Sequence, residues 1–138
     1  MMERAVQDIK RLGIVACREH DRLRDIVKRM ADDDISALVV VDAQNILRGI
    51  ISRSDLLAAY VDDPDWAGAH VAKYMTRQVV TVPPTTPLSE AVRLLLGQHI
   101  HRLVVVSEDE DGVHPIAVVS DSDIVTCMAD NPDLQAIS

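Results

Sequence analysis

The two halves of this chain carry the same phrase of amino acids. Residues 49–57 read GIISRSDLL, and residues 117–125 read AVVSDSDIV. A valine-rich run lies ahead of each phrase, ALVVV at 37–41 and RLVVV at 102–106. A repeat on this scale restricts the fold more than any other feature, because each copy must form the same supersecondary unit. Equivalent pairs are Val6 and Val71, Leu23 and Leu88, Ile35 and Ile100, Ser52 and Ser120, and Asp55 and Asp123.

Each copy predicts the element order β-α-β-β-α. A short apolar stretch suits a first strand, GIVAC at 13–17 or VVTV at 79–82. A helix follows, with Asp21 or Thr86 as its candidate N-cap and Pro87 at the first helical position of the second copy. The valine-rich run then suits a strand buried on both faces. The expected buried helical faces, spaced i, i+3, i+4, i+7, are Leu23, Ile26, Val27 and Met30 in the first copy and Leu88, Ala91, Val92 and Leu95 in the second.

We assign residues 6–61 to the first copy, 62–70 to a linker and 71–130 to the second copy. Each copy contains a hairpin turn after its valine-rich run, and the turn of the second copy is longer, SEDEDGVHP, which predicts a solvated turn. Neither copy buries enough surface to be stable alone, so we expect the two sheets to pack together. The expected fold class is α/β (α+β).

Composition excludes several classes of function. Hydrophobic residues make up 48% of the 138 residues, but phenylalanine is absent, so the core must consist of Val, Ile, Leu, Ala and Met. The net charge of −8 disfavours nucleic-acid binding, which needs clustered Lys and Arg. No apolar run approaches the ~20 residues of a membrane span, so no membrane partner is expected. Cys17 and Cys127 lack metal-type spacing and no signal peptide is recognisable, which favours a reduced, cytoplasmic setting.

The Ser-x-x-Asp phrase suits a ribose phosphate. We expect a helix to begin near Ser54 or Ser122, with Asp55 or Asp123 in its first turn. A helix N-terminus offers free N–H groups to a phosphate, and a carboxylate can accept hydrogen bonds from both ribose hydroxyls. Ser and Asp are also common helix caps that need no ligand, so capping stands as the alternative. The recurrence of the pair in both copies favours ligand binding.

The order of these motifs resembles a tandem pair of cystathionine-β-synthase (CBS) domains, the Bateman module, over residues 6–130. The resemblance implies two β-α-β-β-α repeats paired through their sheets with pseudo-twofold symmetry. It also implies a central cleft that binds adenosine compounds: AMP, ADP, ATP, S-adenosylmethionine or a dinucleotide. The implied ligand-binding residues are Asp55 and Asp123 for the ribose, Ser52 and Ser120 on the phosphate side, His101 and Arg102 for the phosphates, and Thr81 and Val82 for the base.

The two copies differ where a phosphate would bind. The first copy has Ser36 and Ala37 at the positions of His101 and Arg102, and the second copy has Ala117 where the family prefers glycine. We therefore expect two unequal sites. The main site would consist of Ser120, Asp123, His101 and Arg102, and the secondary site of Ser52 and Asp55.

A metal site is a weaker hypothesis. His99 and His101 alternate in sequence and His114 lies nearby, so two imidazoles could meet one ion. No Cys or Glu completes a recognisable set of zinc ligands, so we expect no metal and no obligatory cofactor. Cys17 and Cys127 suit small buried hydrophobic positions better than redox centres.

The final helix of each copy suits self-association. Residues 56–60 and 124–128 present apolar side chains, and Trp66, the only tryptophan, suits a cleft or dimer contact or a surface anchor. No Ser-His-Asp arrangement, Walker loop, GxGxxG or HExxH motif is found, so we expect no enzymatic activity. The expected function is a homodimeric regulatory module that binds an adenosine ligand and signals to an effector protein in trans, or within a longer protein. The alternatives are a ligand-free dimerisation module and a metal-binding CBS protein.

Overall fold

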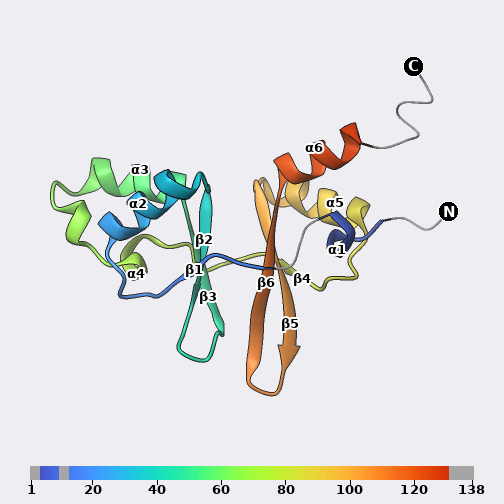
Figure 1. Ribbon diagram of the computed structural model, residues 1–138, viewed down its shortest axis with the longest axis horizontal. Coiled ribbons are helices and arrows are strands. Elements are labelled where there is room, and N and C mark those ends of the chain that lie inside the picture. The colour runs from blue at the N-terminus through green and yellow to red at the C-terminus, as the bar shows by residue number, and fades with distance from the viewer. Residues whose placement is uncertain (1–3, 10–12, 131–138) are drawn as a thin grey trace. The chain divides into compact units, whose positions relative to one another are not determined.

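The computed structural model describes residues 4–9 and 13–130, which form two compact units (Figure 1). The first-copy unit consists of residues 14–79 and 109–114. The second-copy unit consists of residues 4–9, 13, 80–108 and 115–130. Each unit is built mainly from one repeat, but neither unit follows the repeat boundaries.

The first-copy unit contains a three-stranded sheet in the order β1-β2-β3. Strand β1 runs parallel to β2, and β3 pairs with β2 in the antiparallel sense. The parallel pair needs the crossover helix that lies between its strands in sequence. The elements are β1 (Ala16–Cys17), α2 (Leu23–Asp33), β2 (Ala37–Val41), β3 (Leu47–Ser52), α3 (Arg53–Asp62), a 3-10 turn η1 (Trp66–Gly68) and α4 (Val71–Tyr74).

The second-copy unit repeats this plan with the sheet order β4-β5-β6. The predicted β-α-β-β-α order and the mixed α/β class are therefore confirmed in both copies, whereas the packing of the two sheets against each other stays a prediction. A short helix at the start of each copy was not predicted. The elements are α1 (Val6–Ile9), β4 (Thr81–Val82), α5 (Leu88–Gln98), β5 (Arg102–Asp109), β6 (Gly112–Ser120) and α6 (Asp121–Ala129).

The short helices are exchanged between the copies. Helix α1 begins the first copy in sequence but belongs to the second-copy unit, where the Val6 N–H donates to the Thr86 carbonyl at 2.9 Å. Helix α4 begins the second copy in sequence but belongs to the first-copy unit, where the Val71 N–H donates to the Asp21 carbonyl at 2.9 Å. Both valines are fully buried. Each copy therefore supplies a core residue to the unit of the other.

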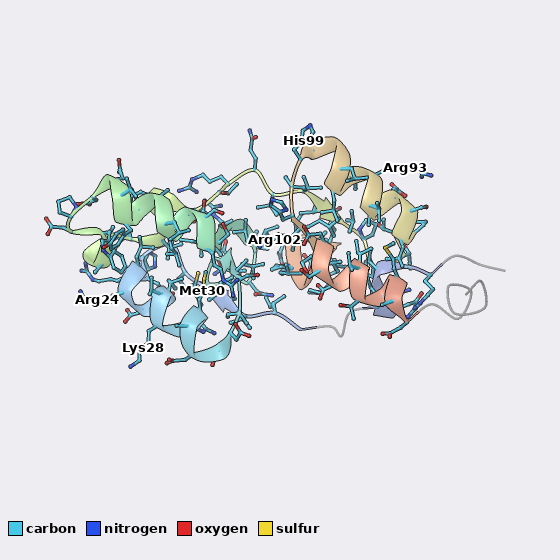
Figure 2. All side chains as sticks on the ribbon, turned by 90° about the horizontal axis from the view of Figure 1, so that it is seen from above. Arg24, Lys28, Met30, Arg93, His99 and Arg102 are labelled. Carbon is cyan, nitrogen blue, oxygen red and sulfur yellow. The ribbon has the colours of Figure 1, made fainter. Side chains whose placement is uncertain are left out.

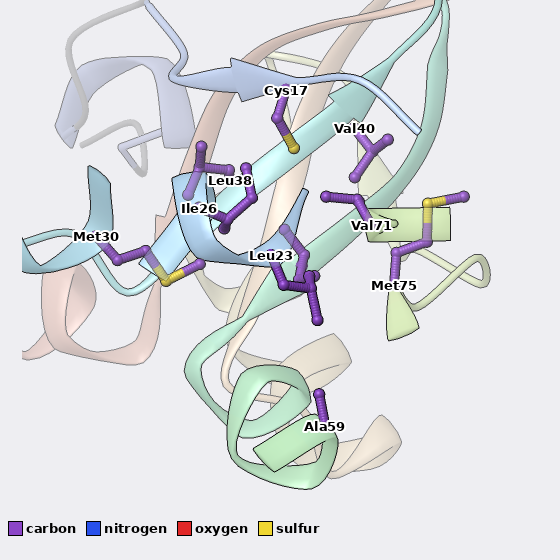
Figure 3. Packing of buried hydrophobic residues seen from close by; sticks show 10 residues of the cluster. Cys17, Leu23, Ile26, Met30, Leu38, Val40, Ala59, Val71 and Met75 are labelled. Atoms are coloured by element: carbon purple, nitrogen blue, oxygen red, sulfur yellow. The ribbon is translucent and has the colours of Figure 1, made fainter. Parts of the chain in front are cut away.

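Most of the predicted helical face lies in the core of each unit, whereas Leu88 and Val92 are only partly buried against the core and Val27 lines the first groove instead. Figure 3 shows Leu23 and Ile26 of α2 against Leu38 and Val40 of β2. On the same helix Met30 is buried, while Lys28 projects away from the ribbon (Figure 2). The expected burial of the valine-rich strands on both faces is also confirmed, because four consecutive residues are buried in β2 and in β5. The core of the second-copy unit comprises Val6, Val82, Ala91, Leu95, Leu103, Val105, Ala117, Val119 and Ile124.

The helix starts lie one or two residues away from the predicted ones. Helix α3 is preceded by Ser52 as N-cap rather than Ser54, and α6 by Ser120 rather than Ser122, because each serine ends its strand with an extended backbone. In the first helices Arg22 and Pro87 are the N-cap residues. The side chains expected to cap act in the preceding turn: the Asp21 carboxylate accepts the Arg18 N–H, and the Thr86 hydroxyl donates to the Pro83 carbonyl.

Two further expectations change. The first strands are two-residue segments, shorter than GIVAC and VVTV predicted, because each pairs with only a short stretch of its parallel neighbour. The predicted turn in SEDEDGVHP is also shorter, since β5 extends to Asp109 and β6 begins at Gly112. None of the helices in the described ranges has the length and apolarity that crossing a bilayer requires.

Gly49 of β3 is expected to tolerate no side chain. A Cβ atom at this position would lie 2.6 Å from the Thr76 carbonyl oxygen, which accepts the Ile50 N–H at 2.9 Å. We expect Gly49→Ala to lower the free energy of unfolding by about 1–3 kcal/mol through overpacking. Urea unfolding measures this change. The matched control is Gly97→Ala in α5, where a Cβ meets nothing within 4 Å and should stabilise the helix by up to about 1 kcal/mol; equal effects of the two substitutions would contradict the steric argument.

Candidate ligand-binding site

The repeated Ser-x-x-Asp phrase forms a capping box at the start of the last helix of each copy. At α6 the Ser120 N–H donates to the Asp123 carboxylate at 2.8 Å, and the Asp123 N–H donates to the Ser120 hydroxyl oxygen at 3.1 Å. At α3 the Ser52 N–H and hydroxyl both donate to the Asp55 carboxylate, at 2.9 and 3.1 Å. The capping alternative is therefore realised at both positions, because the reciprocal bonds satisfy N–H groups that a helix start leaves open.

Capping leaves both boxes accessible to a ligand. All four side chains of the two boxes are half-buried rather than enclosed. At α3 the Thr76 hydroxyl donates to the second oxygen of Asp55 at 3.4 Å, which is longer than a strong O–H···O bond. A ribose hydroxyl at an ordinary distance would bind this oxygen better than Thr76 does. The two boxes can thus act as helix caps and still present a carboxylate.

The residues assigned to the phosphates and the base come from the same unit as the second box. His101 precedes β5, Arg102 begins β5, and Thr81 and Val82 form β4. Thr81 is exposed and Val82 is buried in the core, so of these two only Thr81 presents its side chain to a ligand. Strand β4 pairs with β5 through Thr81 and Val104 and through Val82 and Val105, so the two residues assigned to the base lie beside the strand that Arg102 begins.

The charges around the two boxes differ in a way that the sequence analysis missed. His101 does not stand alone: its Nδ1 atom lies 3.1 Å from the Asp121 carboxylate, whose pKa this hydrogen bond lowers. In the first copy the position of Asp121 is taken by Arg53, which lies 3.6 Å from Asp34. The sequence shows that Arg53 follows Ser52, but it does not show that Asp34 is the partner of Arg53. The first box therefore has a cation of its own, and the second has an additional carboxylate.

An apolar groove lies beside each box. The groove of the first-copy unit has a volume of about 420 Å³ between α2 and α3, and that of the second-copy unit about 550 Å³ between α5 and α6. Tyr60 and Trp66, whose ring centroids are 6.1 Å apart, line the first groove. His101 and Asp121 line the second. Large apolar side chains exposed in these grooves are Leu57, Tyr60, Leu96, Val125 and Met128.

The two cysteines differ from each other. Cys17 is buried in the core as expected, and burial, followed by the nearby Asp21, raises the pKa of its thiol to about 12, which keeps it protonated. Cys127 is only half-buried, against expectation, and its sulfur accepts a hydrogen bond from Arg4 at 3.1 Å. It lines a small polar pocket of about 210 Å³ that also includes Asp123.

The histidines of the metal hypothesis do not share a unit. His99 and His101 belong to the second-copy unit, whereas His114 belongs to the first-copy unit. Across residues 4–9 and 13–130 no group of three or more His, Cys, Asp or Glu side chains is placed to hold a metal ion.

Comparison with known proteins identifies the family. The model of the CBS domain matches residues 6–62 and 71–130. The chain therefore belongs to the CBS domain family and carries two tandem CBS domains, which confirms the resemblance seen in its motifs.

Solved structures share this fold over nearly the whole chain. The AcuB protein of Vibrio cholerae, a candidate acetoin utilization protein, is similar with a TM-score of 0.84 and 28% identity, over 99% of this chain and 98% of that chain. The CBS domain pair of protein MJ0100, solved in complex with 5′-methylthioadenosine and S-adenosyl-L-methionine, has a TM-score of 0.83 over 94% of this chain and 98% of that chain. At 21% identity this second likeness shows the fold.

Among curated proteins, the gamma-3 subunit of human 5′-AMP-activated protein kinase is 36% identical over 52 residues, which cover 38% of this chain and 11% of that subunit. An uncharacterised 17.7 kDa protein of Acidianus ambivalens is 26% identical over 112 residues, or 78% of this chain. The chain spans 65% of the length of that protein, so it matches only part of each of these two relatives.

The second capping box gives a stability test for the role of Asp123. Asp123→Ala removes the acceptor of the Ser120 N–H, so we expect it to lower the free energy of unfolding by about 1 kcal/mol. Asp123→Asn keeps an oxygen that can accept this bond and should lose less than half as much. Thermal unfolding without ligand measures both. Equal stability of the wild type and Asp123→Ala would show that the box contributes nothing to folding.

Proposed function

We propose that this protein is a non-catalytic regulatory module that binds adenosine-containing ligands through its two Ser-x-x-Asp helix starts. The observation that carries the proposal is the presence of the same box at α3 and at α6, half-buried in each case. A fold alone would not specify the ligand. The family supports the adenosine class, since one structural relative was solved with two adenosine compounds and another relative belongs to an AMP-activated kinase.

In this proposal the carboxylate of each box binds the ribose. Ribose hydroxyls donate to the Asp123 or Asp55 oxygens, and such charge-assisted bonds are stronger than neutral ones. The N-terminus of the following helix and the Ser120 or Ser52 hydroxyl lie on the phosphate side. Thr81 contributes its side chain to base binding from β4, and the buried Val82 contributes its backbone. The ligand then adds donors to carboxylates that already order the helix starts.

The charges beside each box set the expected order of affinity. His101 and Arg102 would contact the phosphates at the main site, which stays assigned to Ser120 and Asp123. A phosphate arriving there must compete with Asp121 for His101. The secondary site has Arg53 next to Ser52, but this cation is already paired with Asp34. We therefore expect phosphate-bearing ligands to bind mainly at the main site, and the secondary site to stay empty or to take a ligand without charged phosphates.

Ligand binding can be measured by thermal shift and calorimetry. The panel is AMP, ADP, ATP, NADH, 5′-methylthioadenosine and S-adenosylmethionine, and a ligand at ~100 times its dissociation constant adds about 2.7 kcal/mol to stability. We expect at least one compound to raise the melting temperature by a few degrees.

Asp123→Asn should weaken that binding about tenfold or more, because its amide accepts fewer hydrogen bonds from a ribose. The matched variant is Asp55→Asn in the other copy, which should have the smaller effect if the main site is correctly assigned. A melting temperature that no compound raises, or a ligand affinity that is unchanged in both variants, would favour the ligand-free dimerisation module.

We also propose that the two apolar grooves bind a second copy of the chain. Leu57 and Tyr60 are each 68% exposed on α3, and Val125 and Met128 are 62% and 59% exposed on α6. Surfaces of this kind are typical of interaction sites. Self-association would cover these side chains and place the boxes near the interface between copies. A ligand bound there can change the surface that the dimer presents to an effector protein.

Leu57→Lys or Val125→Lys should shift a dimer toward the monomer. A charged side chain in a covered groove must be desolvated, which we expect to weaken association at least tenfold. Sedimentation velocity measures the change, and emission from Trp66 in the first groove reports it independently. The control is Val61→Lys, because Val61 is 86% exposed on the same helix and does not line the groove. A wild-type protein that remains monomeric at high concentration would exclude the homodimer.

The output of such a module acts on another protein or another part of a longer chain. A ligand shifts a conformational equilibrium only through different affinities for its states, so an effector must distinguish them. The effector in trans and the cytoplasmic setting stay predictions from the sequence.

A further inference from the structure

The tip of the β5–β6 hairpin holds a histidine between two hydrogen-bond acceptors. The His114 side chain is 19% exposed. Its Nδ1 atom lies 3.1 Å from the Asn45 carbonyl oxygen in the turn between β2 and β3, and its Nε2 atom lies 3.0 Å from the Asp109 carboxylate. All three residues belong to the first-copy unit, so the hairpin tip is part of that unit together with the β2–β3 turn.

Only the imidazolium form satisfies both contacts. A neutral imidazole carries one N–H, so one ring nitrogen would direct its lone pair at an acceptor oxygen. Both of these acceptors lack a proton, since one is a backbone carbonyl and the other a carboxylate. In the imidazolium both nitrogens donate, and His114 then bridges Asn45 and Asp109.

We propose that protonated His114 latches the β5–β6 hairpin tip to the β2–β3 turn, and that this latch opens when the imidazolium loses its proton. The latch is independent of the proposed ligand and controls the order of the hairpin tip. It makes the protein responsive to pH at a point in sequence where β6 begins.

The surroundings of the latch favour a fixed geometry. The Asp109 carboxylate also accepts the N–H groups of Asp111 and Gly112, at 2.8 and 3.2 Å, so it is held in place by its own turn. Gly112 has a φ of +138°, and a Cβ there would lie 3.2 Å from the Ile46 side chain of the facing turn. The hairpin tip and the β2–β3 turn are thus in close contact beside the histidine.

The charged groups around His114 act in the same direction. From its own hairpin, Asp109 and Asp111 both stabilise the imidazolium. The facing turn presents the Asn45 carbonyl, while its carboxylate, Asp42, accepts the N–H groups of Gln44 and Ile46. The hydrogen bond to Asp109 is the main cause that raises the pKa of His114 above 6.5, and the same bond is the main cause that lowers the pKa of Asp109 below 3.8.

These directions define the pH window of the latch. Because folding raises the pKa of His114, its contribution is fully present below pH 6.5 and is lost as the pH rises through the folded pKa. Because folding lowers the pKa of Asp109, its contribution is present above pH 3.8 and is lost as the pH falls through the folded pKa. The latch is therefore closed from pH 3.8 to pH 6.5. As the pH rises from neutral, the loss of the His114 proton opens it.

The test follows the full chain by NMR from about pH 5 to about pH 9. The ring signals of His114 should titrate above 6.5, with both nitrogens protonated at the acid end. Amide exchange, corrected for its intrinsic pH dependence, should lose severalfold protection at residues 42–46 and 110–114 as His114 deprotonates, with no matching change in the β1–β2 pair. Titration of His114 at or below 6.5 would overturn the proposal.

Two variants separate the latch from general pH effects. His114→Gln should abolish the alkaline loss of protection, and Asp109→Asn should return the His114 titration toward 6.5. The matched control is His101→Gln, which alters a histidine–aspartate pair whose imidazole is 79% exposed and has one acceptor; it should leave the tip unchanged. A pH profile that persists in His114→Gln would also overturn the proposal, and if that variant fails to fold, the direct titration of the wild type decides.

Discussion

The backbone bonds that hold the exchanged helices are the constraint on which both units depend. The Val6 N–H bonds to the carbonyl of Thr86 and the Val71 N–H to that of Asp21, and each bond places a fully buried valine under the helix of the other copy. Without α1 the core of the second-copy unit would lack a member, and without α4 the first-copy core would lack one too. Neither repeat contains a complete core, so each of the two units needs a helix from the other repeat.

Patterns over a few residues of the sequence correctly predicted the elements whose formation depends on neighbouring residues. The valine-rich strands and the apolar face of α2 follow from periodicity over a few residues, and the structure confirms them. Helices α1 and α4 were not predicted, because four residues are too few to show a helical period. Their positions also depend on contacts with residues far along the chain. The N-caps were misplaced for a related reason: a serine at the end of a strand and a serine inside the first helical turn look alike until the strand pairing is known.

The candidate site was predictable in its residue types but not in its charge balance. Ser52 with Asp55 and Ser120 with Asp123 were found from the repeat, and the structure brings each pair within hydrogen-bond distance. The pairing of His101 with Asp121 and of Arg53 with Asp34 depends on side chains from separate elements, which spacing in sequence does not reveal. One motif thus serves two copies with opposite charge beside it, so the two helix starts are chemically distinct although their backbones are alike.

The exchange of α1 and α4 also has a consequence for how molecules of this chain can join. A helix that reaches its place from a different copy of the repeat fits an identical place in a neighbouring molecule, where Val6 would find the same hydrophobic surroundings and the same Thr86 carbonyl. Such a domain-swapped assembly would reuse the contacts that hold α1 within one chain, which makes it a low-cost route to a dimer. The helix exchange that completes each unit within one chain is thus also a route by which separate chains can become interlocked.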